Sequence, residues 1–385
     1  MTIDLLAMKN TRFQKIPGHV AALALGFVVA LGLPMNERAQ TASKNRDNKA
    51  DSATTAGDNL RADKTPRGVG ADMDFERGDF MRDFTYKNYP KMWRDSSPTG
   101  AYRKTNIEWE RTKQGAWFVE EQRNGAYAVV GGTAVRDRES IERGLVILRW
   151  AFAQQKADGS WNCPDAYHST SLFLAAAARA MLHLQNSRYA KDYANELTTM
   201  KAALHRAARW MTRPEVEAAG IENESPYTHR FYAMALALGQ TGVLNNDKAL
   251  IEKAHRFARE GLKRQHPSGY NPEKGGYDTS YNAAGLMLAA QFYLNVADDS
   301  IRPEILEMYR KSIAWQLARI GSDGIVETAG NTRVGAESTE ITRNNAKKRV
   351  NIGDVTRALA YWSYFTGDKS PERLAEKVAT VKQPN

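Results

Sequence analysis

The chain has 385 residues, of which 42% are hydrophobic and 25% charged, as is typical of a protein that buries a core. Its net charge of +10 favours an acidic partner such as an anionic polymer, although the basic residues are spread over amphipathic segments, as on a solvated basic surface. The single cysteine, Cys163, excludes an intramolecular disulfide and any zinc site built from several cysteines.

The first 72 residues have the features of an export segment followed by a linker. Three basic residues precede an uncharged stretch whose apolar centre, 20–33, is as long as a signal-peptide core and short for a membrane-spanning helix. Because Glu37 weakens the cleavage motif, an uncleaved membrane anchor stays an alternative. We therefore expect residues 1–39 to be a signal peptide or membrane anchor of a periplasmic or secreted protein. The polar residues 40–72 are expected to be a disordered linker.

Residues 73–137 form an extension that precedes the repeated part of the chain. Apolar and polar residues alternate at 117–130, and the Asn-Gly pair at 124–125 is typical of the turn in a two-residue β-hairpin. We expect this extension to pack on the domain that follows and to contain such a hairpin.

From about residue 138 the chain alternates between two kinds of predicted helix. The first kind is long and amphipathic, and is predicted at 140–155, 191–211, 247–265 and 303–320. The second kind is rich in Ala and Gly and apolar almost all round, as in a helix buried on all sides, and is predicted at 170–184, 231–239, 282–294 and 355–365. Long loops lead into the second kind and short loops lead out of it, so one end of the array carries most of the loop residues. We expect the buried helices to begin near residues 168, 229, 279 and 353.

The alternation repeats four times with a period of about 50 to 65 residues, which indicates a helical array. Residues 155–161, QKADGSW, resemble the Q-x-x-D-G-S-W turn of α/α toroids, a fold that includes terpene cyclases and several carbohydrate-active families. The resemblance covers about residues 138–367. It implies an all-α fold in which residues 138–385 form an (α/α)n toroid or an incomplete barrel of helical hairpins.

The known chemistries of this fold narrow the expectation. The chain lacks the D-x-D-D and D-D-x-x-D motifs of terpene cyclases, and Cys163 lies in the wrong kind of segment for the Asp-Cys-His zinc site of protein prenyltransferases. Residues 225–232, SPYTHRFY, distantly resemble the N-N-H-S-Y-W segment of alginate-lyase-like enzymes, without the paired Asn before the His. This resemblance implies a polysaccharide lyase that cleaves an acidic, uronate-containing polysaccharide by β-elimination.

The candidate site residues gather where the buried helices begin. His229, Tyr281 and Asp354 each lie four positions before a small residue, so they occupy similar turns at the start of three buried helices. The fourth helix start offers Tyr167 and His168. In a toroid these helix ends surround one cavity, so we expect these side chains to converge.

Elimination next to a carboxylate needs a base for the proton, an acid for the leaving oxygen and a group that neutralises the carboxylate. We expect Tyr281 to be the acid or base, with His229 as its partner and His168 nearby. Arg230 or Arg333 would neutralise the substrate carboxylate. The structural alternatives are a hydrogen-bonded histidine at a helix start for His229 and a solvated charged loop for Arg333.

Other side chains in the same loops are expected to bind the substrate, because aromatic faces suit the apolar faces of sugars and polar groups suit their hydroxyls. They are Trp161, Tyr167, Tyr227, Tyr270, Tyr277, Asp278, Arg333 and Asp354. For Trp161 core packing is the better interpretation, and Asp278 is well placed to cap the helix that follows it.

Two other functions stay open. A glycoside hydrolase on the same scaffold would need two carboxylates across the scissile bond. The candidates are Glu222, Glu224, Asp278, Glu327, Asp354 and Asp165, and no pair stands out by its spacing. The other alternative is a non-catalytic protein for polysaccharide binding or export. No motif indicates a metal, a cofactor or nucleic acid, so we expect none of these partners, and membrane contact only through the N-terminal segment.

Overall fold

The computed structural model describes residues 75–76, 78, 81, 93–342 and 346–384. Outside their helices these residues form loops and isolated bridges, without a strand, so the all-α fold class is confirmed for this part of the chain. Among the described helices, none combines the length and the hydropathy needed to cross a membrane. The expected signal or anchor and the linker, together 1–72, lie outside the described residues.

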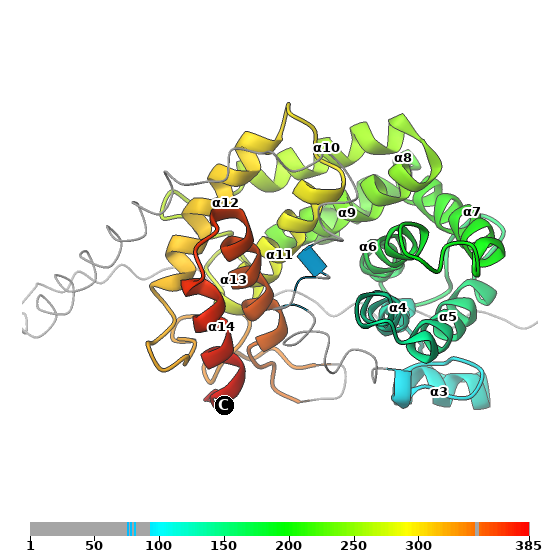
Figure 1. The fold of residues 1–385 in the computed structure, drawn as a ribbon, viewed down its shortest axis with the longest axis horizontal. Helices are drawn as coiled ribbons and strands as arrows, with labels where there is room; N and C mark the ends of the chain where they lie inside the picture. The colour runs from blue at the N-terminus through cyan, green and yellow to red at the C-terminus, as the bar shows by residue number, and fades with distance from the viewer. Residues whose placement is uncertain (1–74, 77, 79–80, 82–92, 343–345, 385) are drawn as a thin grey trace, which may run out of the picture. The chain divides into compact units, whose positions relative to one another are not determined.

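Five of the described helices are buried on most of their faces. Each of them is followed along the chain by a helix that packs against it (Figure 1). The buried helices are α4 (Arg123–Val135), α6 (Ala166–Gln185), α9 (Thr228–Asn245), α11 (Thr279–Asn295) and α13 (Ile352–Thr366). Their partners are α5 (Arg138–Ala153), α7 (Ala194–Met211), α10 (Lys248–Lys263), α12 (Arg302–Leu317) and α14 (Ser370–Thr380). Other described elements are α3 (Arg103–Thr112), the 3-10 helix η4 (Val119–Gln122) and α8 (Pro214–Glu224).

The buried helices form a row, in which α4 packs against α6, α6 against α9, α9 against α11, and α11 against α13. The alternation of two helix kinds is therefore confirmed. The four predicted helix starts lie within two residues of the observed ones, which are Ala166, Thr228, Thr279 and Ile352. The row begins with α4, so the described part of the chain holds one helical pair more than the four repeats we expected.

The expected β-hairpin at 117–130 is wrong, because this stretch forms η4 and the first part of α4. Gly125 lies inside α4, where an added Cβ would meet the carbonyl oxygen of Gly144 in α5 at 2.7 Å. An added Cβ on Gly144 would in turn meet the carbonyl oxygen of Gly125 at 2.5 Å. The glycine of the Asn-Gly pair therefore permits a close contact between two helices instead of a turn.

The turn that contains QKADGSW joins α5 to the loop before α6. Gly159 has φ +94°, and an added Cβ would meet the carbonyl oxygen of Arg206 in α7 at 2.3 Å, so this position requires glycine. The turn recurs after α10, where Gly269 has φ +100° and the same kind of close contact with Lys311 in α12. In both turns the glutamine four residues earlier donates to the glycine carbonyl and to a carbonyl of the next partner helix. The turn is thus a repeated structural unit of the array.

Glu76 connects two helices that are not neighbours in the row. Its fully buried carboxylate pairs with Arg179 of α6 and Arg357 of α13, the latter at 2.7 Å. The hydroxyl of Tyr361, also in α13, donates to the same carboxylate oxygen at 2.9 Å. Phe75 stacks on Tyr361 with ring centroids 4.3 Å apart. A residue of the extension thereby holds α6 and α13 to a common centre.

Candidate active site

His229 and Tyr281 lie side by side at the starts of α9 and α11, with ring centroids 4.9 Å apart. The Nδ1 atom of His229 lies 2.7 Å from Oε1 of Glu273, which also accepts the backbone N–H of His229 at 3.1 Å. Glu273 is fully buried in the loop before α11, and an isolated β-bridge to Tyr227 fixes this loop against the start of α9. Two helix starts and one loop therefore position the histidine and the tyrosine.

The environment of His229 favours the neutral imidazole. Burial lowers the pKa of His229 below its usual value, and Arg333 and Arg230 add to this, while the nearby Glu273 carboxylate opposes it. When the Nδ1 atom of a neutral imidazole faces a carboxylate, the ring proton lies on Nδ1. The lone pair is then on Nε2. The histidine is thus arranged as a proton acceptor at Nε2.

Arg333 comes from the long loop before α13 and covers Tyr281. Its guanidinium lies 3.6 Å from the centroid of the Tyr281 ring and 4.5 Å from that of Tyr227. It is almost fully buried and pairs with Glu273 at 3.0 Å and with Glu340 at 3.3 Å. Because two carboxylates already neutralise this arginine, it is better suited to positioning Tyr281 than to binding a substrate carboxylate.

Lys348, from the same loop, lies next to the hydroxyl of Tyr281. Its Nζ atom is 3.2 Å from the phenolic oxygen and 2.5 Å from Oε2 of Glu340. Burial by itself would raise the pKa of Glu340. Hydrogen bonds from Lys274 and Lys348 and the charge of Arg333 have the larger combined effect, so the pKa is lowered to about 2. Glu340 is therefore a fixed negative charge that pairs with three cations, of which Arg333 and Lys348 contact Tyr281.

Asp278 is the N-cap of α11 and also anchors the long loop. One carboxylate oxygen accepts the backbone N–H groups of Ser280 and Tyr281, at 3.0 and 2.9 Å. The other accepts those of Arg333 and Val334, at 2.9 and 3.0 Å. Burial raises the pKa of this fully buried carboxyl in spite of these donors. Its capping role is confirmed, and its four acceptor positions are used within the protein.

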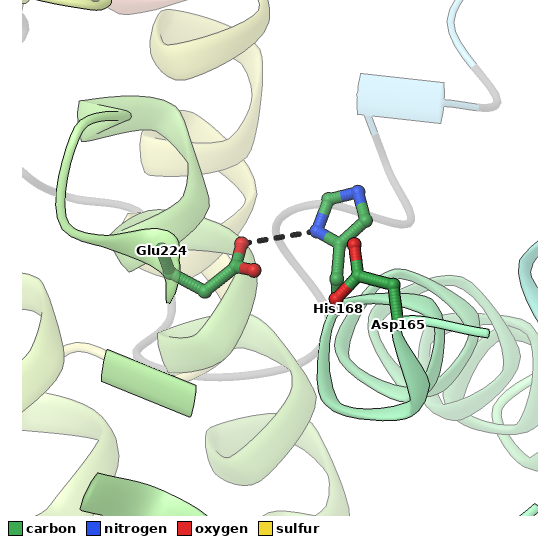
Figure 2. A group of neighbouring side chains, drawn as sticks. All are labelled: Asp165, His168 and Glu224. Atoms are coloured by element: carbon green, nitrogen blue, oxygen red, sulfur yellow. Dashed lines mark hydrogen bonds and ion pairs between the residues drawn. The ribbon is translucent and has the colours of Figure 1, made fainter. Parts of the chain in front are cut away.

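A second group of side chains lies at the start of α6. His168 Nδ1 is 3.0 Å from Oε2 of Glu224, at the end of α8 (Figure 2). His168 Nε2 is 3.7 Å from Oε2 of Glu120. Arg230 pairs with the same oxygen of Glu224 at 2.9 Å. Its guanidinium also lies 3.9 Å from the ring centroid of Tyr227, beside His229. Arg230 thus connects the His168 group to the His229 group.

The four expected catalytic residues, His229, Tyr281, Arg230 and His168, therefore belong to one chain of contacts, and Tyr227 lies within it. Glu273 and Lys348 were not expected from the sequence. The only signal for Glu273 is an acidic residue in a loop otherwise rich in Gly and Tyr, and Lys348 is one of several cations in a long charged loop. Nothing in their spacing links them to Tyr281.

Trp161 and Tyr167 are buried in this structure, and their contact with a substrate stays a prediction. Trp161 is 1% exposed, packs against Phe152 and Phe173, and donates from Nε1 to a backbone carbonyl of α5 at 2.8 Å. Tyr167 packs against Gly220 of α8, and burial raises the pKa of its hydroxyl. Both side chains are shielded by neighbouring helices, as the core interpretation of Trp161 requires.

Three other expected binding residues are not among the contacts of the His229 group. Tyr270 and Tyr277 form a separate aromatic cluster with Trp315, at centroid distances of 5.3 and 5.5 Å, so their contact with a substrate stays a prediction. Asp354 lies in the first turn of α13, half-buried, and accepts a hydrogen bond from Asn351 at 2.8 Å. Burial raises the pKa of Asp354 to about 6, although the charges of Arg357 and Arg123 lower it. Two surface hollows, one between α12 and α14 and one beside α3, share no residue with the His229 group.

Comparison of the chain with protein-family models, with curated proteins and with solved structures gives no match.

Proposed function

We propose that the protein is a polysaccharide lyase that cleaves an acidic, uronate-containing polymer by β-elimination. The observation that carries the proposal is the pair of His229 and Tyr281, in ring contact at two helix starts and surrounded by cations. Elimination needs a proton acceptor, a proton donor and positive charge, and it needs no carboxylate nucleophile. These are the groups that this cluster provides.

In the proposed reaction one of the two side chains takes the proton at C5 of the uronate. The C5–H electron pair forms the C4–C5 double bond as the C4–O bond breaks, and the other side chain gives a proton to the leaving oxygen. The free lone pair on Nε2 favours His229 as the base and Tyr281 as the acid. Lys348, 3.2 Å from the Tyr281 hydroxyl, would stabilise the oxyanion left by the proton transfer. Arg230, which is less buried than Arg333, is the better candidate to neutralise the substrate carboxylate.

A glycoside hydrolase is the second candidate. Its general acid needs a carboxyl with a raised pKa. Glu340 does not fit this requirement, since its pKa is about 2, and Asp278 is used by four backbone N–H groups. Asp354 has a pKa raised to about 6 and is the carboxylate that favours this alternative. The lyase explains more of the cluster, since His229 and Tyr281 have no evident role in hydrolysis.

We further propose that the row of helical pairs closes into an α/α toroid and that the protein acts after export. Closure is supported by Arg123 at the start of α4, whose charge acts on Asp354 at the start of α13, the other end of the row. Glu76, which joins α6 to α13, supports it as well. Export rests on the signal or anchor expected at 1–39.

The test is incubation with a panel of polyuronates, followed by ultraviolet absorbance of the unsaturated product, since only elimination creates the conjugated double bond. Tyr281→Phe should lower the rate by about 10²–10⁴-fold with the fold intact. The control is Tyr193→Phe, which removes a hydroxyl that also lies 3.2 Å from a charged side chain, Glu142, outside the cluster. Full activity of Tyr281→Phe would refute the mechanism. New reducing ends without the ultraviolet signal would favour the hydrolase.

A further inference from the structure

His168, Glu224 and Asp165 offer ligand atoms for a cation. One ring nitrogen of His168 and one carboxylate oxygen from each acid lie within 4.8 Å of one another. Figure 2 shows the three side chains facing a common space, His168 and Asp165 from the start of α6 and Glu224 from the end of α8. The 3.0 Å between His168 Nδ1 and Glu224 Oε2 suits two ligands that each lie about 2.0–2.2 Å from one metal ion.

Glu224 supplies the observation that distinguishes this group from a surface cluster of charges. Its side chain is 1% exposed, and its Oε2 atom is shared by His168 and Arg230. Its Oε1 atom is buried without a hydrogen-bond partner among the described residues. A buried polar atom without a partner costs about 1–3 kcal/mol, and more when it is charged. Figure 2 shows both oxygens of Glu224 on the side that faces His168 and Asp165, where a cation would satisfy the second one.

Asp165 provides the third carboxylate. It occupies the N-cap position of α6, but its backbone is left-handed, with φ 50° and ψ 51°, and its side chain makes no capping hydrogen bond. An aspartate at this position normally stabilises its helix by accepting a backbone N–H. Here the exposed carboxylate lies beside His168 and Glu224 instead. Glu120, 3.7 Å from the other ring nitrogen of His168, adds negative charge.

We propose that His168, Glu224 and Asp165 bind a divalent transition metal ion such as Zn²⁺ or Mn²⁺. One imidazole nitrogen with carboxylate oxygens suits these ions better than Mg²⁺ or Ca²⁺, which prefer oxygen ligands alone. Arg230 pairs with the liganding carboxylate of Glu224 and orients it. Three protein ligands leave coordination positions for a substrate. The role that follows rests on the proposed function: the ion would bind the uronate carboxylate next to Arg230 and Tyr227.

The experiment is a calorimetric titration of the full chain, free of any affinity tag and stripped of metal with a chelator, with Zn²⁺ and with Mn²⁺. Asp165→Asn should weaken binding at least about tenfold. Its fold should be unchanged, because no hydrogen bond to the Asp165 side chain is present among the described residues. His168→Gln should weaken binding as well. The control is His205→Gln, because His205 lies 2.9 Å from Asp247 and no group of three metal ligands includes this pair among the described residues. This variant should bind as the wild type does.

Absence of binding to the wild type, or equal affinities of the wild type and Asp165→Asn, would overturn the proposal. Loss of binding in His205→Gln would do the same, because it would place the ion at the other histidine. This readout is independent of catalysis. Metal binding that depends on Asp165, without cleavage of any polyuronate, would refute the proposed function and support the metal site. Polyuronate cleavage that persists after chelator treatment, without metal binding, would support the proposed function and refute the metal site.

Discussion

Asp278→Asn tests the dual role of the Asp278 carboxylate. Asn keeps one oxygen for Ser280 and Tyr281, but turns an NH₂ group toward the backbone N–H groups of Arg333 and Val334. Hydrogen bonds to a charged group contribute about 1.5–3 kcal/mol each, so the loss of two should lower the free energy of unfolding by about 3–6 kcal/mol. This corresponds to a decrease in Tm of about 6 °C or more, at about 2–4 °C per kcal/mol for a large domain.

The measurement is urea unfolding followed by far-ultraviolet circular dichroism. The matched control is Asp247→Asn, because Asp247 caps α10 with a single backbone N–H, that of Leu250 at 3.2 Å. Asn caps a helix about as well as Asp, so this control should cost less than about 1 kcal/mol. Asp278→Asn should also make the loop at 330–342 more sensitive to protease, while the control should not. If both variants lost the same free energy, the loop would not depend on Asp278 and our account of the site would be wrong.

Two further predictions concern the ion pairs of the cluster and the core. Glu340→Gln should destabilise the protein at pH 7, and the difference from the wild type should decrease as the pH falls from about 5 toward 3. The reason is that a carboxyl whose folded pKa is lowered to about 2 contributes stability above its usual pKa and loses it in acid. A difference in unfolding free energy that did not change with pH would contradict this. Trp161→Ala should cost about 3–5 kcal/mol in thermal or urea unfolding, since the ring is 1% exposed in the core. Weaker polymer binding without loss of stability would instead support the predicted stacking of Trp161 on sugars.

The periodic features of the sequence predicted the helical part of the fold. Runs of Ala and Gly with little charge indicated the buried helices, and their starts placed His229 and Tyr281 in equivalent turns, which the structure brings into contact. The Asn-Gly pair at 124–125 misled the prediction, because glycine in α4 and glycine in a hairpin turn look alike locally. The role of Gly125 is decided by its contact with Gly144 in α5, which lies outside the stretch 117–130 on which the hairpin prediction was based.

The partners of the site residues could not be predicted, because they depend on contacts between distant segments. Glu273 is 44 residues from His229, and Lys348 is 67 residues from Tyr281. No local pattern indicates which of several charged loop residues will face a given ring. The same applies to His168 and Glu224, which lie 56 residues apart and showed no metal-binding spacing.

The contacts of Glu76 also have a consequence for the order in which the chain folds. Arg357 and Tyr361 lie 281 and 285 residues later in the sequence, so these contacts close a loop that spans most of the chain. The entropic cost of loop closure rises by only about 0.6 kcal/mol for each doubling of loop length, so this long separation has little effect on the stability of the native state. The separation has a larger effect on the order of folding, because Glu76 is synthesised long before α13. Until α13 emerges, Arg179 is the one described arginine of this contact that can pair with Glu76. The centre of the fold is therefore completed only after the chain has been synthesised through α13.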